Sequence, residues 1–343
     1  MSRLDDYQNA LLATYPDVAD NELARTLDEG GPRFVSFVIS HGLGPMWHAR
    51  TGRTEFHASR LSAEALFLAQ EHALKDIDTA LSSAGIQYAL IKGAASRLLL
   101  YENPAVRACH DLDVLVCPDD KARATTVLTK AGFEAQPEAD SISREVVLSR
   151  GEVNTDLHWA LLREGRLRND TTEEMLTRRQ RVGDTWTLSA EDALFVLLVH
   201  PAFAKHLGGW EMGLHRVADI DVWMRTQPYE WQVVRRQLEQ NGVVAAAWAT
   251  LRWLELLSDQ NVQPGLAAML TDLRPGRLRR TWLDYWLRNN LSARTSRWHW
   301  ARLLGLSMFF HDAPADAVRA LTGGYRARRR SRADLAAFAE LLD

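Results

Sequence analysis

The sequence predicts an α+β protein, in which a small mixed β-sheet with flanking helices is followed by a helical C-terminal domain. Residues 88–188 contain several short strand-like segments bounded by turns. Residues 58–84, and nearly all of the chain from Ser189 on, instead repeat apolar side chains at helical spacing. A composition of 46% hydrophobic and 25% charged residues is typical of a globular protein.

Three segments follow from this pattern. They are an N-terminal helical segment over 1–60, an α/β core over 61–188 and a helical domain over 189–343. The helix over 58–84 leads into the core and is followed by Gly85, a frequent helix stop. The helical domain should begin at Ser189, a predicted N-cap with Asp192 three residues later, in a pattern close to a capping box.

The centre of the core is predicted between residues 88 and 116. The elements in order are a strand over 88–91, a turn at Lys92-Gly93, a helix over 94–101 and a second strand that carries Asp111 and Asp113. Side chains two residues apart on a strand point to the same face, so the two carboxylates should lie side by side. Leu112, Val114 and Val116 then face the core on the other side of the strand.

Asp111 and Asp113 predict a divalent metal site. Two like charges at the head of an apolar strand are unfavourable unless a cation lies between them. Oxygen ligands suit Mg²⁺ or Mn²⁺. A further strand over 153–157 places Asp156 and His158 on one face, and Asp156 becomes the third carboxylate if this strand pairs beside the first. Three carboxylates can hold two metal ions roughly 3.5–4 Å apart, which suits activation of a hydroxyl and departure of pyrophosphate.

The remaining elements are mixed up to Ser189 and helical after it. In order they are a helix over 119–131, strands over 144–149 and 153–157, a helix over 172–179, a hairpin over 181–188, and helices over 212–226, 228–241, 243–258, 264–272, 276–290, 297–310 and 332–342. Residues 326–332 are rich in Arg. Because like charges repel, they are predicted to form a mobile, solvated arm before the last helix.

These features together resemble a known family. The residues that carry the resemblance are Leu90-Ile91-Lys92-Gly93, Arg107, Asp111-Leu112-Asp113, Gly132-Phe133, Asp156-Leu157-His158-Trp159 and Glu191-Asp192 with His200. Over roughly residues 60–225 the chain resembles the uncharacterised bacterial nucleotidyltransferase family of the DNA polymerase β-type nucleotidyltransferase superfamily. The resemblance implies metal-dependent transfer of a nucleotidyl group from a nucleoside triphosphate (NTP) to a hydroxyl or phosphate acceptor. The helical domain would form the acceptor side of the cleft.

The resemblance also implies the site residues. They are the catalytic and metal-binding Asp111, Asp113 and Asp156, and the nucleotide-binding Lys92, Gly93, Arg107 and His158. The superfamily's usual Gly-Gly or Gly-Ser turn is replaced by Lys92-Gly93-Ala94, where the lysine can act as a point charge on phosphate and helix N–H groups can assist. Two roles stay open: Arg107 either touches phosphate or stabilises its loop, and His158 either orients Asp156 or contacts substrate.

Two alternatives to this function also stay open. The altered turn favours a sugar nucleotide as donor, or a peptide in place of a small-molecule acceptor, at the same metal site. Residues 274–332, with fourteen Arg, three acids and interleaved Trp and Tyr, favour an RNA-binding or tRNA-modifying, toxin-like module. The chain as a whole has a net charge of −3, which disfavours nucleic acid as the partner.

Composition also bears on location and on the cysteines. The longest apolar stretch, over 193–204, contains His200 and Pro201 and is too short to cross a bilayer. The first residues include acids and no apolar signal region, so we expect a cytoplasmic protein with no membrane partner. Cys109 and Cys117 flank the Asp-bearing strand, about 26 Å apart at about 3.3 Å per residue, so both are expected to be reduced thiols.

Overall fold

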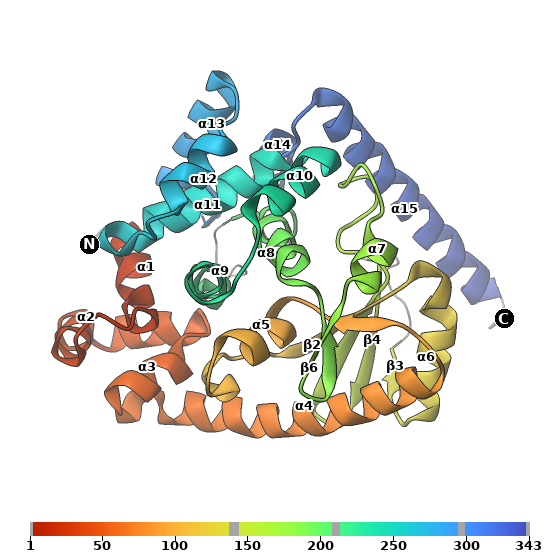
Figure 1. Ribbon diagram of the computed structural model, residues 1–343, viewed down its shortest axis with the longest axis horizontal. Helices are drawn as coiled ribbons and strands as arrows, with labels where there is room; N and C mark the ends of the chain where they lie inside the picture. Colours follow the sequence, from red (N-terminus) through yellow and green to blue (C-terminus); the bar gives the residue numbers. More distant parts are fainter. Residues whose placement is uncertain (1–2, 137–143, 208–212, 294–298, 341–343) are drawn as a thin grey trace.

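The structure, a computed structural model, describes residues 3–136, 144–207, 213–293 and 299–340. Within these residues the chain forms a 7-stranded mixed sheet with helices on both faces (Figure 1). The strands are β1 (Tyr88–Leu90), β2 (Asp111–Val116), β3 (Glu134–Ala135), β4 (Glu145–Arg150), β5 (Val153–His158), β6 (Gln180–Val182) and β7 (Thr185–Thr187). Their order across the sheet is β3-β4-β5-β2-β1-β7-β6. The predicted α+β fold is therefore confirmed.

Strand β2 lies at the centre of the sheet. It pairs antiparallel with β1 and parallel with β5. Leu112, Val114 and Val116 are buried on one face, as predicted, and Asp113 and Leu115 are buried on the other. A strand covered on both faces belongs in the middle of a sheet, where both of its edges are hydrogen-bonded. The carboxylate of Asp113 is therefore built into the interior of the fold.

One face of the sheet is covered by the long helix α4 (His57–Ser83) and by α6 (Lys121–Lys130). In Figure 1, α4 runs below the sheet along the whole lower edge of the molecule. Ile77 and Leu81 of α4 and Leu128 of α6 belong to the same apolar core as Val114 and Val116 of β2. This burial sets the register of β2, because a shift by one residue would turn its apolar side chains to the other face.

The other face of the sheet packs against α8 (Ala190–Lys205). Ala89 and Leu115 of the sheet join Leu194 and Leu198 of α8 in a second core. The Ser189 hydroxyl accepts a hydrogen bond from the Asp192 amide, so the predicted N-cap is confirmed. Since Asp111 and Asp113 alternate along β2 with the side chains buried under α4, their carboxylates face the helical region.

Further helices of the described residues lie before the sheet, between its strands and after it in the chain. They are α1 (Arg3–Leu11), α2 (Asp20–Ser40), α3 (Gly44–Thr51), α5 (Lys92–Leu100), α7 (Thr172–Thr177), α9 (Leu214–Thr226), α10 (Trp231–Asn241), α11 (Val244–Ser258), α12 (Leu266–Asp272), α13 (Arg277–Arg288), α14 (His299–Phe309) and α15 (Pro314–Glu340). The N-terminal helices share the core of α8: the rings of Tyr7 and Trp253 lie 6.1 Å apart. The division of the chain at residues 60 and 188 stays a prediction.

The Arg-rich segment 326–332 is helical, and the prediction of a mobile arm is wrong. These residues lie within α15, one continuous helix. Ala, Leu and Arg are strong helix formers, and here this local preference outweighs repulsion among the arginines. Gly323 inside the helix has a packing role, because a Cβ there would lie 2.5 Å from the Glu164 carbonyl oxygen. The predicted helix starts at 212 and 297 and the predicted end at 342 lie outside the described residues.

Candidate active site

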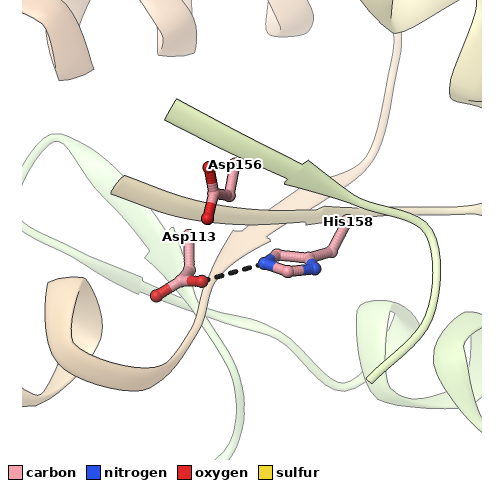
Figure 2. Close-up of side chains that lie close together, drawn as sticks. All are labelled: Asp113, Asp156 and His158. Carbon is pink, nitrogen blue, oxygen red and sulfur yellow. Dashed lines mark hydrogen bonds and ion pairs between the residues drawn. The ribbon is translucent and has the colours of Figure 1, made fainter. Parts of the chain in front are cut away.

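The strand register brings the predicted carboxylates together. Asp113 of β2 is the parallel partner of Asp156 on β5, and Asp111 is the partner of Asn154. Partners on adjacent strands project from the same face, with the strands about 4.8 Å apart. Figure 2 shows Asp113, Asp156 and His158 on the same side of these two strands. The prediction that the Asp156 strand pairs beside β2 is confirmed.

A cavity of about 260 Å³ lies over these carboxylates. On the side of the sheet it is lined by Lys92, Asp111, Asp113, Glu145, Asp156 and His158. The rest of its lining comes from the loop after β5, from α8 and its C-terminal end, and from α9: Leu161, Leu162, Arg163, Arg166, His200, Phe203, Ala204, Lys205, His206 and Arg216. The cavity thus has an acidic floor on the sheet and a largely basic wall on the loop and helices.

Asp113 is the centre of a hydrogen-bonded cluster. Its Oδ1 accepts a hydrogen bond from Lys92 Nζ at 2.6 Å and lies 2.8 Å from His158 Nε2 (Figure 2). The other ring nitrogen of His158, Nδ1, lies 3.1 Å from Glu145 Oε2. His158 therefore bridges two carboxylates, and Lys92 pairs with Asp113. Lys92 has a φ of 53°, uncommon for a residue with a side chain, and it is the first residue of α5, so the predicted turn belongs to this helix.

The two paired aspartates differ in their protonation. Burial alone would raise the pKa of Asp113, but the Lys92 ammonium and the hydrogen bond from His158 outweigh it and hold this pKa well below its ordinary range. The pKa of Asp156 is instead raised to about 7, first by burial and then by the charges of Asp113 and Asp111. One carboxylate is thus always ionised near neutral pH, while its neighbour exchanges a proton there.

Three ligand atoms of the cluster are close enough to share one cation. In the described part of the chain, the group with this property consists of Asp113, Asp156 and His158, whose ligand atoms all lie within 4.8 Å of one another. Asp111 lines the same cavity but is not in this group. The predicted triad thus differs from this group in one member. Asp111 lies at the start of β2, two residues before Asp113, and its partner on β5 is Asn154 rather than Asp156.

Arg107 precedes β2 and is bound to the helical region. Its guanidinium forms an ion pair with Asp219 of α9 at 2.6 Å and donates to the Ala108 carbonyl, and the side chains of Arg107 and Asp219 are only 3% and 1% exposed. A Cβ at Gly93 would lie 2.6 Å from the Arg107 Nη1 atom. Arg107 therefore covers the start of α5 and anchors the loop that leads to Asp111, which fits the stabilising role left open by the sequence.

Sequence reasoning missed the basic residues of the cavity. Arg163 and Arg166 lie in an irregular loop after β5, where no periodic pattern assigns a face. Arg216 of α9 and Lys205 of α8 were also not singled out, whereas His200, one of the residues that carry the resemblance, lines the cavity. The one available signal was the density of basic residues at 163–168 directly after the Asp156 strand. Glu145 was missed because its position opposite His158 depends on strand register.

The order strand, helix and Asp-bearing strand, with a third acid on the neighbouring strand of the sheet, is the arrangement that the sequence resemblance implies. The comparison with known families identifies the class as nucleotidyltransferase. Residues 47–259 match the family described as uncharacterised nucleotidyltransferase, and this is more than half of the chain. The chain therefore belongs to the uncharacterised nucleotidyltransferase family. No match was found among curated proteins. Among the described helices, none is both long enough and apolar enough to cross a membrane.

Proposed function

We propose that this protein is a metal-dependent nucleotidyltransferase that moves a nucleotidyl group from an NTP to a hydroxyl or phosphate acceptor. The observation that carries the proposal is the Asp113, Asp156 and His158 group on the floor of a cavity, in a chain that belongs to a nucleotidyltransferase family. The membership in the DNA polymerase β-type superfamily is part of the same proposal.

The residues at the floor fit a divalent cation. Two carboxylates and an imidazole can each offer one ligand atom, a donor set that suits Mn²⁺ or Mg²⁺. The raised pKa of Asp156 supports the assignment, because burial and the neighbouring Asp113 and Asp111 leave its charge without sufficient compensation. Asp113, Asp156 and His158 would hold the cation, with Asp111 beside them. Such a cation, when bound, lowers the pKa of an acceptor hydroxyl and offsets charge on the leaving pyrophosphate.

The side chains of the site would have different roles in the reaction. Asp156 is the carboxylate proposed to take the proton of an acceptor hydroxyl. Asp113 stays ionised and orients His158 and Lys92. The Lys92 ammonium, already at the acids, can move to the phosphate nearest to them, as the sequence predicted. Asp219 and Arg107 position the loop before β2 and do not need to touch substrate.

A sugar nucleotide is the second candidate donor. The observation in its favour is the altered start of α5, where Arg107 rather than open space lies against Gly93. The acceptor would be a small molecule or a peptide in either case. The two donors differ in the leaving group, which is pyrophosphate from an NTP and a nucleoside diphosphate from a sugar nucleotide.

The test is a donor screen with the full-length protein in Mg²⁺ or Mn²⁺. Wild type should consume one class of donor and release pyrophosphate, and product mass should show an added nucleoside monophosphate. Asp113→Asn and Asp156→Asn should both abolish turnover. Release of nucleoside diphosphate from sugar nucleotides alone would replace the first proposal with the second. Turnover that persists in both variants would exclude this cavity as the active site.

A further inference from the structure

We infer that a wall of basic side chains, Arg163, Arg166 and Arg216, binds the oligophosphate chain of the donor across the cavity from the acidic floor. This inference rests on the proposed function and names the binding residues that the function requires. None of the three belongs to the family pattern that carried the resemblance. These three arginines form the basic wall of the cavity.

The start of α5, where the resemblance implies a phosphate contact, lies against another basic side chain. A Cβ at Gly93 would meet Arg107 Nη1 at 2.6 Å and Nη2 at 2.9 Å, so a guanidinium lies directly against this residue. That guanidinium is neutralised by Asp219 at 2.6 Å. The first residue of the helix, Lys92, is engaged by Asp113 and His158. An oligophosphate of three or four negative charges therefore needs further cations from another part of the cavity.

Arg163 and Arg166 supply such cations. Both line the cavity that Asp113 and Asp156 line. Within the part of the chain that the structure describes, neither guanidinium has a carboxylate in ion-pair contact. Arg166 is held instead by a neutral partner, the carbonyl oxygen of Phe203, and its guanidinium lies 5.5 Å from the centre of the Phe203 ring. These contacts fix the orientation of the Arg166 guanidinium, but neither of them is with an acidic side chain.

Electrostatics indicate that this arrangement is costly without a ligand. The pKa of Arg166 is lowered to about 10, first by burial and then by the adjacent charge of Arg163. The pKa of Arg216 is also lowered, first by burial and then by Arg107. Like charges gathered in a half-enclosed space are stabilised by an anion, and guanidinium groups bind phosphate oxygens in a forked, bidentate geometry.

Charge complementarity then sets the orientation of the donor. The acids of the floor and the arginines of the wall share one space of about 260 Å³, so an anion bound to the wall lies beside the proposed cation site. The oligophosphate would lie between them, with its reacting phosphorus toward Asp156 and its leaving phosphates toward the wall. The same chemistry is present in an NTP, in a sugar nucleotide and in free tripolyphosphate.

The experiment measures binding of inorganic tripolyphosphate to the full-length protein by calorimetry, with Mg²⁺ present. Arg163→Gln and Arg166→Gln should each weaken binding by roughly 10- to 100-fold, the loss expected for one charge-assisted contact. The matched control is Arg168→Gln, two residues beyond Arg166. Arg168 pairs with Asp316 at 2.7 Å and does not line this cavity. The control should lower thermal stability and leave the affinity for tripolyphosphate unchanged.

A further variant of Arg166 keeps the test decisive. If Arg166→Gln does not fold, Arg166→Lys retains the charge but not the fork, and it should bind tripolyphosphate more weakly than wild type. Wild-type affinity in folded Arg163→Gln together with wild-type affinity in either Arg166 variant would overturn the inference. Competition of ATP and of UDP-glucose against tripolyphosphate then identifies the source of the phosphates, since only the true donor class should displace it and also turn over.

Failure of this inference differs from failure of the proposed function. If tripolyphosphate binding depends on the wall but no donor is turned over, the phosphate site stands and the nucleotidyl transfer does not. If an NTP is turned over with release of pyrophosphate, and Arg163→Gln and Arg166→Gln leave KM unchanged, the function stands and the basic wall is not its phosphate site.

Discussion

The arginines of the scaffold and those of the cavity differ in their partners. Arg107, Arg168 and Arg252 each face an aspartate, with the shortest N–O distances at 2.6 Å, 2.7 Å and 2.7 Å. Arg166 is held by the Phe203 carbonyl and ring, Arg163 is exposed, and in the described residues neither has an acidic partner. The difference does not come from local sequence, because Arg166 and Arg168 are only two residues apart in one loop.

The aspartates show the same contrast. Asp219 is buried and meets Arg107 in a bidentate geometry, so its charge is compensated within the protein. Asp156 lies beside Asp113 and Asp111 and has a pKa raised to about 7 by burial and then by these like charges. Scaffold charges are therefore matched inside the chain. In the cavity, Asp113 is paired with Lys92, whereas Asp156, Arg163 and Arg166 have no ion-pair partner among the described residues, so the partners that they lack are a cation and an anion.

The largest effect should come from breaking a scaffold pair. Arg107→Ala leaves Asp219 buried without a counter-ion, which should lower the free energy of unfolding by about 3–5 kcal/mol. Arg163→Gln, which breaks no ion pair, should change it by less than about 0.5 kcal/mol. Urea unfolding of both variants measures the difference. Equal stability of the two would mean that the paired and unpaired arginines are not distinct classes.

Substitution of Asp113 and substitution of Asp156 should have different effects on the free energy of unfolding when EDTA keeps the protein free of metal. Asp113→Asn removes an ionised acceptor of Lys92 and should cost about 1.5–3 kcal/mol of unfolding free energy. Asp156→Asn should leave stability equal or higher, because this carboxylate is the one that burial and its neighbours disfavour in the charged form. Both variants should lose the rise in melting temperature on addition of Mn²⁺. A retained rise in both would remove these residues from the metal site.

Asp156 should also make cation binding depend on pH. The ionised form of this group holds the cation, so protons compete near its pKa of about 7. Between pH 6 and pH 8 the ionised fraction, and hence the apparent affinity for Mn²⁺, should rise about tenfold. Titrations at both pH values check this, and an affinity independent of pH would show that Asp156 is not a ligand.

Without metal the sign of this pH effect is reversed. The folded state binds the Asp156 proton more tightly than the unfolded chain, whose pKa is near 3.8. The contribution of Asp156 to stability is therefore fully present below pH 3.8 and is lost as the pH rises to about 7. The difference in unfolding free energy between wild type and Asp156→Asn, measured over this pH range, gives the contribution of Asp156 alone, because both proteins contain the same histidines. A difference that does not change over this range would contradict the raised pKa.

The smallest effect is expected from the end of α15. Truncation after Gly324 removes residues 325–343, and those of them that the structure describes do not line the cavity, so affinity for Mn²⁺ should stay within about twofold of wild type. Gly323, which packs on the Glu164 carbonyl, is retained. Calorimetry of the truncated protein measures the affinity. A loss of cation binding in a folded truncated protein would place this end of the helix at the cavity.

Much of the fold was predictable because it depends on neighbours along the chain. The alternation of Asp111, Leu112, Asp113 and Val114 assigns opposite faces from the geometry of any strand. The hydroxyl of Ser189 caps α8 through an amide only three residues away. The sequence placed Asp156 beside Asp113 on the condition that the two strands pair, and the parallel pairing of β2 with β5 meets that condition. The prediction that residues 326–332 form a mobile arm failed because charge was weighed above helix propensity.

The sequence by itself determined the sheet, its apolar face and the pair of acids on β2, since each follows from a period of two residues and from burial. Tertiary structure alone decided which distant side chains meet. Arg107 and Asp219 are 112 residues apart, and no pattern in either segment predicts their contact. Whether Arg166 or Arg168 receives an acid depends on where α15 places Asp316. Such contacts depend on how whole helices and strands pack together. A short repeat of side chains along the sequence carries no information about that packing.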